Sequence, residues 1–349
     1  MIRRRPSFHP LPQTIELTPT LYFPRLLVGL WALSSDRWNE PVAEHKIVNE
    51  LRQYYQNGMI GFDMADIYGP AEKIYGAFIE SLKTSPPSSH LSSHLPQPVS
   101  MTKFVPKPGE MTFDKVKEAI EASLGRMKIE TVDLIQFHWW DYSDKRYLDA
   151  LTHLNELTKL DDPLVRHVGL TNFDSERLEE ICQKVPNIRT NQVQFSIIDT
   201  RPEGKMRKVC ERYNVKLLTY GTLCGGLLSE KYIGQSPPSS PTPSQAKYLQ
   251  SILQWGSWDL FQELLQVLQE IAVKHGYTIA NVATKYVLRQ PHVAAVIVGA
   301  RLGVNQHIEE NWRSLECNLS DEDLEKIQAV QQKGKHLEDV IGDCGDEYR

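Results

Sequence analysis

The stretch GFDMADIYG at residues 61–69 decides the fold. The apolar residues that lead into it predict the end of a short buried strand, and residues 71–82 carry apolar side chains at helical spacing. Between them lies a turn that carries Asp63, Asp66 and Tyr68. An α/β fold places its chemistry on the turns that follow its strands. The turn is therefore either part of a functional site or a solvated loop in which Asp63 caps the next helix.

The same alternation of strand and helix recurs along the chain. Candidate strands cover residues 26–31, 59–63, 99–104, 132–138, 165–170, 190–194, 216–220 and 293–298. Candidate helices cover residues 42–56, 71–82, 111–127, 147–160, 175–184, 204–213, 260–274, 279–288 and 304–315. This order predicts an α/β fold of the (β/α)8 TIM barrel type, with an N-terminal hairpin and long loops at the strand ends. A doubly wound sheet is the alternative, but the first candidate strand lacks the GxGxxG turn usual in dinucleotide-binding sheets.

A single domain over residues 1–349 is expected, with the barrel core at about 26–315, because no linker interrupts the pattern. Two stretches rich in Pro and Ser, 84–98 and 234–246, predict mobile loops. The polar residues 342–349 predict a loose tail. The spacing of His90 and His94 within the first loop is too weak a signal for a metal site, and no metal is predicted.

Composition limits the classes of function. Hydrophobic residues make up 41% and charged residues 24% of 349 residues, which predicts a large core. A net charge of -5 with mixed signs argues against a nucleic-acid partner. Five scattered cysteines without a CxxC motif favour a reducing compartment, here the cytoplasm. No apolar run approaches the roughly 18 residues of a membrane span. We expect a small-molecule partner, no membrane association, and a monomer or homo-oligomer.

Two further polar residues close the neighbouring strands. Lys103 closes the third candidate strand and His138 the fourth, so a barrel brings them to the same opening as Asp63 and Tyr68. Each has an ordinary structural explanation, since Lys103 can reach solvent along the surface and His138 can be a core histidine. Together they fit carbonyl reduction. Tyr68 would donate a proton, and the Lys103 ammonium would lower its pKa from about 10.

These four residues stand in the contexts GFDxAxxYG, TK and DLxxxHW. Asp63, Tyr68, Lys103 and His138 in these contexts resemble the Asp, Tyr, Lys, His tetrad of the aldo-keto reductases, and the resemblance extends over residues 26–315. It implies an NADPH-dependent oxidoreductase that reversibly reduces an aldehyde, ketone or aldose carbonyl to the alcohol. Asp63 would keep Lys103 charged, and His138 would orient the carbonyl.

The resemblance also implies a nicotinamide site, with NADP preferred over NAD. Three residues would bind the nicotinamide carboxamide: Thr171, Asn172 and Gln192. Tyr220 would stack under the nicotinamide ring. The remaining contacts would come from Gly221, Leu223, Gly225, Arg301, His307, Glu310 and Asn311. Arg301 would bind the adenosine 2'-phosphate and Glu310 with Asn311 the adenine. The chain departs from the family pattern in residues 221–223, where Ser-Pro-Leu is usual, and at His307, where Arg or Gln is commoner.

Aromatic residues on strand-end loops predict the substrate pocket. Trp31 and Trp139 are the principal candidates, and Trp140 and Tyr142 are near the same opening. Two other functions stay open at this point. One is a regulatory module with little turnover, similar to the potassium-channel beta subunits of this fold. The other is a barrel hydrolase that uses Asp63 and Asp66 as paired carboxylates.

Overall fold

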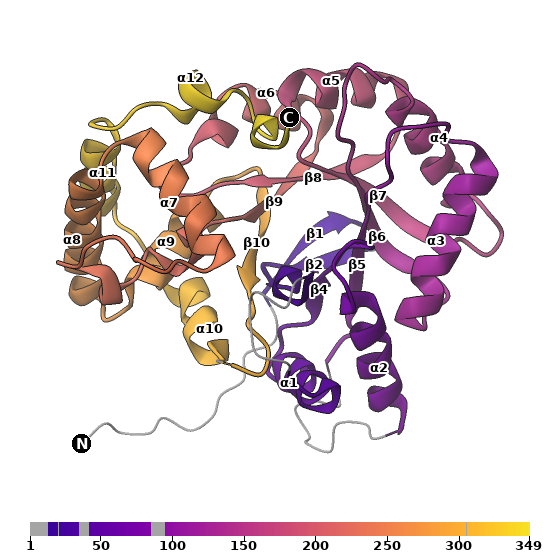
Figure 1. The fold of residues 1–349 in the computed structure, drawn as a ribbon, viewed down its shortest axis with the longest axis horizontal. Helices are drawn as coiled ribbons and strands as arrows, with labels where there is room; N and C mark the ends of the chain where they lie inside the picture. The colour runs from indigo at the N-terminus through magenta and orange to yellow at the C-terminus, as the bar shows by residue number, and fades with distance from the viewer. Residues whose placement is uncertain (1–12, 20, 35–41, 85–94, 305) are drawn as a thin grey trace.

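The computed structural model describes residues 13–19, 21–34, 42–84, 95–304 and 306–349. Within these residues, eight parallel strands close into a barrel in the order β10-β3-β4-β5-β6-β7-β8-β9 (Figure 1). The strands are β3 Leu26–Gly29, β4 Gly61–Asp63, β5 Val99–Phe104, β6 Val132–Phe137, β7 Val165–Thr171, β8 Ile188–Gln194, β9 Lys216–Tyr220 and β10 Val293–Gly299. The predicted TIM barrel is confirmed, and each strand lies where its apolar run predicts it.

Helices surround the barrel. Those within the described residues are α1 Glu44–Gln56, α2 Ala71–Thr84, α3 Phe113–Met127, α4 Tyr147–Leu157, α5 Ser175–Lys184, α6 Lys205–Tyr213, α7 Pro243–Trp255, α8 Trp258–His275, α9 Ile279–Leu288, α10 Ile308–Glu316, α11 Asp321–Gln331 and α12 Leu337–Ile341. None of them combines the length and the apolar composition that crossing a bilayer requires.

The predicted N-terminal hairpin is confirmed. It consists of β1 Thr14–Thr18 and β2 Leu21–Pro24, which pair antiparallel. Because a single residue, Arg25, separates the end of β2 from the start of β3, the hairpin lies at the amino ends of the barrel strands. Phe23 of the hairpin is fully buried in the core. The opposite end of the barrel, at the carboxyl ends of the strands, is not covered by the hairpin.

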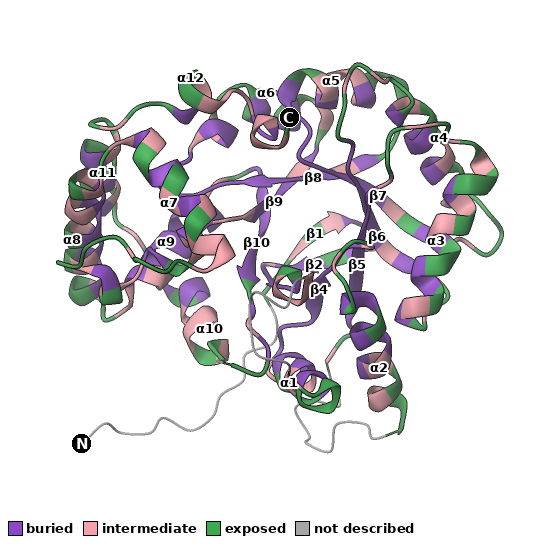
Figure 2. Cartoon of the chain, viewed as in Figure 1, coloured by how far each residue is buried: buried purple, intermediate pink, exposed green. Residues whose placement is uncertain are grey.

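The core follows from helical and strand periodicity (Figure 2). In α1, the buried residues Ile47, Val48, Leu51, Tyr54 and Tyr55 form an apolar stripe at helical spacing. Burial of each large apolar side chain contributes about 1.5–3 kcal/mol to folding. The polar faces of the same helices are exposed to solvent, which explains why the helices in Figure 2 alternate between buried and exposed residues along the chain.

Two segments differ from the sequence-based expectation. The proline-rich stretch expected to be a loop at 234–246 runs into α7, because Thr242 and Gln245 form a capping box around a proline in the first turn. Residues 342–349, expected to be loose, form a short 3-10 turn at Asp346–Tyr348 that packs on the barrel. The other expected loop, at 84–98, lies mostly outside the described residues.

Candidate active site

A cavity of about 650 Å³ opens at the carboxyl ends of the barrel strands. Each strand contributes a lining residue within two positions of its carboxyl end: Gly29, Asp63, Lys103, His138, Thr171, Gln192, Tyr220 and Val298. This follows from parallel strands, whose carboxyl ends meet on one face of the barrel. The position agrees with the prediction that the polar strand ends converge.

The four tetrad candidates lie together in this cavity. The ammonium Nζ of Lys103 donates to Oδ2 of Asp63 at 2.6 Å and to the carbonyl of Met64 at 3.0 Å. The same nitrogen lies 4.9 Å from the ring centroid of Tyr68. The Lys103 and Asp63 side chains are 3% and 5% exposed, so the ion pair is almost completely removed from water. Tyr68 therefore lies beside a fixed, desolvated ion pair.

The electrostatics of Tyr68 differ from the expectation. Burial raises the pKa of Tyr68 well above its ordinary value, and the negative charge of Asp63 raises it further. Burial also lowers the pKa of Lys103, against the opposing effect of Asp63. Because the charge of Lys103 is largely balanced by its partner at 2.6 Å, it does not bring the phenol pKa toward neutrality. Tyr68 is a neutral phenol in this structure.

His138 directly follows β6 and presents one nitrogen to the cavity. Its Nδ1 lies 3.0 Å from the carbonyl oxygen of Thr171, which can only accept, so Nδ1 carries the proton. The other nitrogen, Nε2, is buried and has no hydrogen-bond partner among the described residues. Burial lowers the pKa of His138 to about 4. Near neutral pH, Nε2 is therefore a hydrogen-bond acceptor.

All of the residues predicted to contact the cofactor line the same cavity: Thr171, Asn172, Gln192, Tyr220, Gly221, Leu223, Gly225, Arg301, His307, Glu310 and Asn311. The hydroxyl of Tyr220 donates to Oδ1 of Asn172 at 2.8 Å. This bond leaves the amide nitrogen of Asn172 for a ligand. The buried hydroxyl of Thr171 has no partner among the described residues. His307 Nδ1 lies 2.9 Å from Glu310 Oε2.

The loop after β9 depends on glycine. Gly221 and Gly225 have φ values of +73° and +66°, which disfavour other residues. A Cβ at Gly221 would lie 2.5 Å from the hydroxyl of Tyr248, and one at Gly225 would lie 2.9 Å from Oγ of Ser244. The loop backbone therefore packs directly against α7, and α7 forms part of the cavity wall.

The prediction that Trp139 lines the pocket is wrong. Its side chain is fully buried, stacks on Phe137 at 5.8 Å, and donates from Nε1 to the carbonyls of Asp141 and Asp144. The next residue, Trp140, lines the cavity instead and contacts the His138 ring edge-on at 4.4 Å. The two adjacent side chains point in different directions, so Trp139 packs in the core and Trp140 lines the cavity. Trp31 lines the cavity, as predicted.

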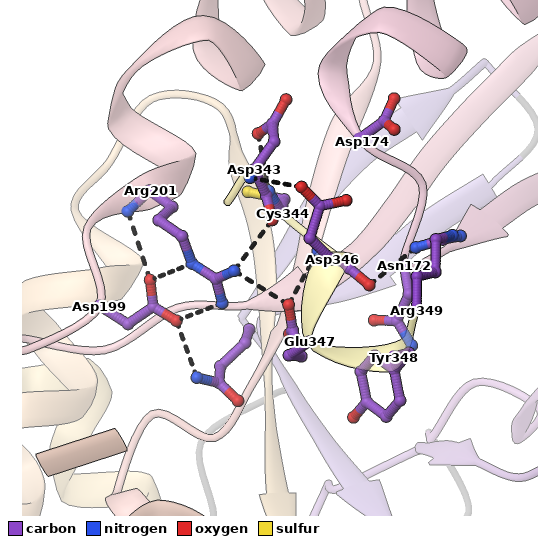
Figure 3. A network of polar contacts seen from close by, with 12 residues as sticks. Asn172, Asp174, Asp199, Arg201, Asp343, Cys344, Asp346, Glu347, Tyr348 and Arg349 are labelled. Atoms are coloured by element: carbon purple, nitrogen blue, oxygen red, sulfur yellow. Dashed lines mark hydrogen bonds and ion pairs between the residues drawn. The ribbon is translucent and has the colours of Figure 1, made fainter. Parts of the chain in front are cut away.

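Sequence reasoning missed that residues 342–349 are held on the barrel by polar contacts (Figure 3) and bring Tyr348 to the cavity. Arg201, 1% exposed, pairs with Asp199 at 2.8 Å and with Glu347 at 2.9 Å. Burial raises the pKa of Glu347, but the charge of Arg201 outweighs this and holds the pKa below its ordinary value. The buried ion triad of Asp199, Arg201 and Glu347 therefore anchors the segment to the loop after β8.

The anchored segment places Tyr348 in the cavity. Its hydroxyl lies 2.6 Å from Nζ of Lys247 on α7 and 3.2 Å from the hydroxyl of Tyr220, and its ring centroid lies 6.1 Å from that of His138. These contacts join residues far apart in the sequence, and no local pattern signals them. No group of three or more His, Cys, Asp or Glu that could hold a metal ion is found in the described ranges.

Comparisons with known proteins agree with this geometry. The sequence model of the Aldo/keto reductase family matches residues 25–332. The chain is 26% identical over 347 residues to a chloroplastic pyridoxal reductase of Arabidopsis thaliana, covering 95% of this chain and 89% of that protein. It is 21% identical over 321 residues to an NADH-specific methylglyoxal reductase of Escherichia coli, covering 88% and 94%.

Solved structures share the fold. A glycerol dehydrogenase from Gluconobacter oxydans superimposes with a TM-score of 0.72 at 22% identity, covering 92% of this chain and 94% of that one. A thermostable aldo-keto reductase gives a TM-score of 0.69 at 24% identity, with coverages of 91% and 99%. The family match extends over the barrel and includes each strand that carries a tetrad residue. The chain belongs to the aldo/keto reductase family of NAD(P)H-dependent carbonyl oxidoreductases.

Proposed function

We propose that the chain reduces an aldehyde, ketone or aldose carbonyl to the alcohol with NADPH, and that Tyr68 is the proton donor. The observation that carries the proposal is the buried pair of Lys103 and Asp63, at 2.6 Å, beside the Tyr68 ring in a cavity that His138 also lines. A neutral phenol next to a desolvated ammonium is suited to protonating an oxygen that gains negative charge.

The cavity fits a nicotinamide cofactor. The hydroxyl of Thr171 is buried without a partner among the described residues, and the Asn172 amide nitrogen is left for a ligand by its bond to Tyr220. Together with Gln192 these groups supply the donors and acceptor that a carboxamide needs. The bound cofactor would supply the hydride that reduces the carbonyl carbon.

Residues of the chain supply the proton that the carbonyl oxygen takes up during reduction. Tyr68 gives its phenolic proton to the carbonyl oxygen as negative charge develops there, and the ammonium of Lys103 stabilises the phenolate left behind. Asp63 keeps Lys103 charged and in place. His138 cannot donate from Nε2 near neutral pH, so it accepts a hydrogen bond from the alcohol hydroxyl that forms.

The preference for NADPH over NADH is proposed from Arg301, which lines the cavity after β10. A guanidinium binds a phosphate with two parallel hydrogen bonds, and the start of α10 adds a favourable helix dipole. One relative is named as NADH-specific, so the preference is a property to be measured for this chain. On the substrate side, Trp31 and Trp140 supply apolar walls suited to an aldehyde or the face of a sugar.

The decisive test compares Tyr68→Phe with the wild-type chain in an NADPH oxidation assay. The panel includes pyridoxal, methylglyoxal, a simple aromatic aldehyde and an aldose, because two relatives bear the names of pyridoxal and methylglyoxal reductases. Loss of the proton donor is expected to lower kcat by about 10²- to 10⁴-fold. Cofactor binding, followed by tryptophan fluorescence, should be retained.

Tyr213→Phe is the matched control, because this tyrosine lies on the outside of the barrel at the end of α6. It should keep full turnover. A wild-type chain that binds NADPH and reduces no member of the panel would contradict the proposal in favour of a regulatory module. A Tyr68→Phe variant with normal turnover would contradict the assigned proton donor alone.

A further inference from the structure

Below the cavity, two glutamines and a carboxylate form a closed hydrogen-bonded triangle. Gln136 of β6 and Gln192 of β8 each donate from Nε2 to Oδ1 of Asp63, at 2.9 Å and 2.8 Å. Gln192 also donates from Nε2 to Oε1 of Gln136 at 2.7 Å. Gln136 is fully buried and is not among the residues that line the cavity, whereas Gln192 is. The triangle therefore joins the barrel interior to the cavity wall.

The chemistry of the three groups fixes their orientation. An ionised carboxylate only accepts hydrogen bonds, so both amide nitrogens must point toward Asp63. Gln192 then uses both of its N–H groups, one on Asp63 and one on Gln136. The carbonyl oxygen of Gln192 is the group left for a ligand. Asp63 and Gln136 together therefore decide that Gln192 offers an acceptor, and not a donor, to the cavity, because Gln136 occupies the N–H that Asp63 leaves over.

The hydrogen bond between Gln136 of β6 and Gln192 of β8 spans β7, which lies between these two strands. Gln136 pairs in register with Lys103 of β5 on one side and with Gly169 of β7 on the other. At the position of β7 that pairs with Gln136 the chain has Gly169, which carries no side chain. A Cβ at Gly169 would lie 2.1 Å from Oγ1 of Thr190, so the position is closely packed.

Packing alone does not account for the triangle. Barrel interiors are filled mainly by branched apolar residues, and each buried amide is costly unless all of its hydrogen bonds are made. A methionine or leucine at position 136 would fill the same volume without that requirement. The polar arrangement gains something that an apolar core cannot supply, namely a fixed direction for the Gln192 amide and two donors to the free oxygen of Asp63.

We propose that Gln136 is a positioning residue for the cofactor. It holds the carbonyl oxygen of Gln192 toward the NH2 group of the nicotinamide carboxamide, and it ties this contact to the carboxylate that pairs with Lys103. The inference rests on the proposed function, because it assumes that the nicotinamide lies against Gln192. It assigns a role in cofactor recognition to a residue that touches neither cofactor nor substrate.

A cofactor analogue isolates the predicted contact. The 3-acetylpyridine analogue of NADP⁺ replaces the carboxamide NH2 with a methyl group, so it keeps the carbonyl and loses only the donor that Gln192 accepts. The wild-type chain should bind NADP⁺ about three- to tenfold more tightly than the analogue, the usual range for one hydrogen bond. In Gln136→Met the Gln192 amide keeps its hydrogen bond to Asp63 but loses the one to Gln136, so its carbonyl oxygen is held less firmly and this ratio should fall toward one.

Two comparison variants make the test specific. Gln194→Met removes another buried glutamine of β8, which donates to Asp199 and does not line the cavity, so its binding ratio should stay at the wild-type value. Gln136→Glu keeps an acceptor for Gln192 but places a second acid beside Asp63. It should keep the binding ratio while adding a new ionisation to the pH profile of kcat. This variant also serves if Gln136→Met does not fold.

The outcomes separate the two proposals. A wild-type chain that binds neither NADP⁺ nor the analogue contradicts the proposed function. A chain that binds and turns over NADPH, but shows no preference for the carboxamide, contradicts only the inference on Gln136. So does a folded Gln136→Met variant with an unchanged ratio, or a Gln136→Glu variant with an unchanged pH profile.

Discussion

The carboxylate of Asp63 is the centre of the site, because its two oxygens serve different partners. Oδ2 receives the ammonium of Lys103 at 2.6 Å, and Oδ1 receives the amides of Gln136 and Gln192. A buried charge that loses its partner is expensive, whereas a buried pair with all its hydrogen bonds satisfied is tolerated. The electrostatics of the cavity therefore depend on this one side chain.

Replacement of the central carboxylate should damage stability and activity together. Asp63→Asn leaves Lys103 buried without a counter-charge, and we expect the free energy of unfolding to fall by about 3–5 kcal/mol. We expect kcat to fall by at least about 10²-fold, since Lys103 would lose its charge or its position. Urea denaturation and steady-state assays measure the two effects. Asp161→Asn, at an exposed position, is the control, and equal behaviour of the two variants would refute the role of the pair.

A second carboxylate of the same turn should give the opposite effect on stability. Burial raises the pKa of Asp66 to about 6. The folded chain therefore holds this proton more tightly than the unfolded chain, and the stability it contributes is lost as pH rises from about 4 to about 6. Asp66→Asn should match the wild type near pH 4 and exceed it by about 1–3 kcal/mol above pH 7. Urea denaturation at both pH values measures this, and a variant that is less stable above pH 7 would contradict it.

The pH dependence of reduction follows from Tyr68 and His138. Burial holds the pKa of His138 at about 4 and raises that of Tyr68 well above its ordinary value. Neither group changes its protonation state between about pH 5 and pH 9, so kcat for reduction at saturating NADPH should be nearly constant over that range. Steady-state rates in overlapping buffers check this. A single ionisation near pH 7 that disappears in His138→Gln would show that the imidazole titrates there.

The buried ion triad should control the substrate wall. Glu347→Gln weakens the attachment of residues 342–349 to Arg201, so Tyr348 should lose its fixed place beside His138. We expect the KM for the carbonyl substrate to rise about fivefold or more, with a smaller change in kcat, since a hydrogen bond to a charged group contributes about 1.5–3 kcal/mol. Amide hydrogen exchange of the segment should accelerate. Glu325→Gln, on the exposed face of α11, should change neither quantity.

Cofactor selectivity gives a further prediction. Arg301→Ala should lower the ratio of kcat/KM for NADPH to that for NADH by about 10- to 100-fold, because the guanidinium distinguishes the two through a single phosphate group. The matched control is Arg289→Ala, an exposed arginine just after α9. If the NADPH-to-NADH ratio of kcat/KM is unchanged in Arg301→Ala, then Arg301 does not bind the adenosine 2'-phosphate.

Local sequence patterns were sufficient to predict the barrel and the convergence of the four tetrad candidates in one cavity. Each strand is a short apolar run followed by turn residues, and Asp63, Lys103 and His138 stand at the ends of such runs. A barrel then brings them together by topology, without any information on side-chain packing. For this reason the convergence could be predicted from residues up to 75 positions apart.

What the sequence did not reveal depends on contacts between distant segments. Trp139 and Trp140 are equally aromatic, and only the turn after β6 decides that Trp139 enters the core and Trp140 the cavity. The polar composition of residues 342–349 predicts a solvent-exposed tail. Instead, the buried guanidinium of Arg201 forms an ion pair with Glu347 and holds the segment on the barrel. The high pKa of Tyr68 likewise follows from its burial, which no motif encodes.

The position of residues 342–349 has a consequence for synthesis of the chain. A ribosome makes the barrel strands first, and β10 can pair with β3 to complete the cylinder before these residues emerge. Glu347 and Tyr348 reach the mouth of the cavity only afterwards. A premature stop codon after Gly342 would therefore yield a polypeptide with all eight described barrel strands, the Lys103–Asp63 pair and Tyr68 in place, yet without Tyr348 on one side of the cavity.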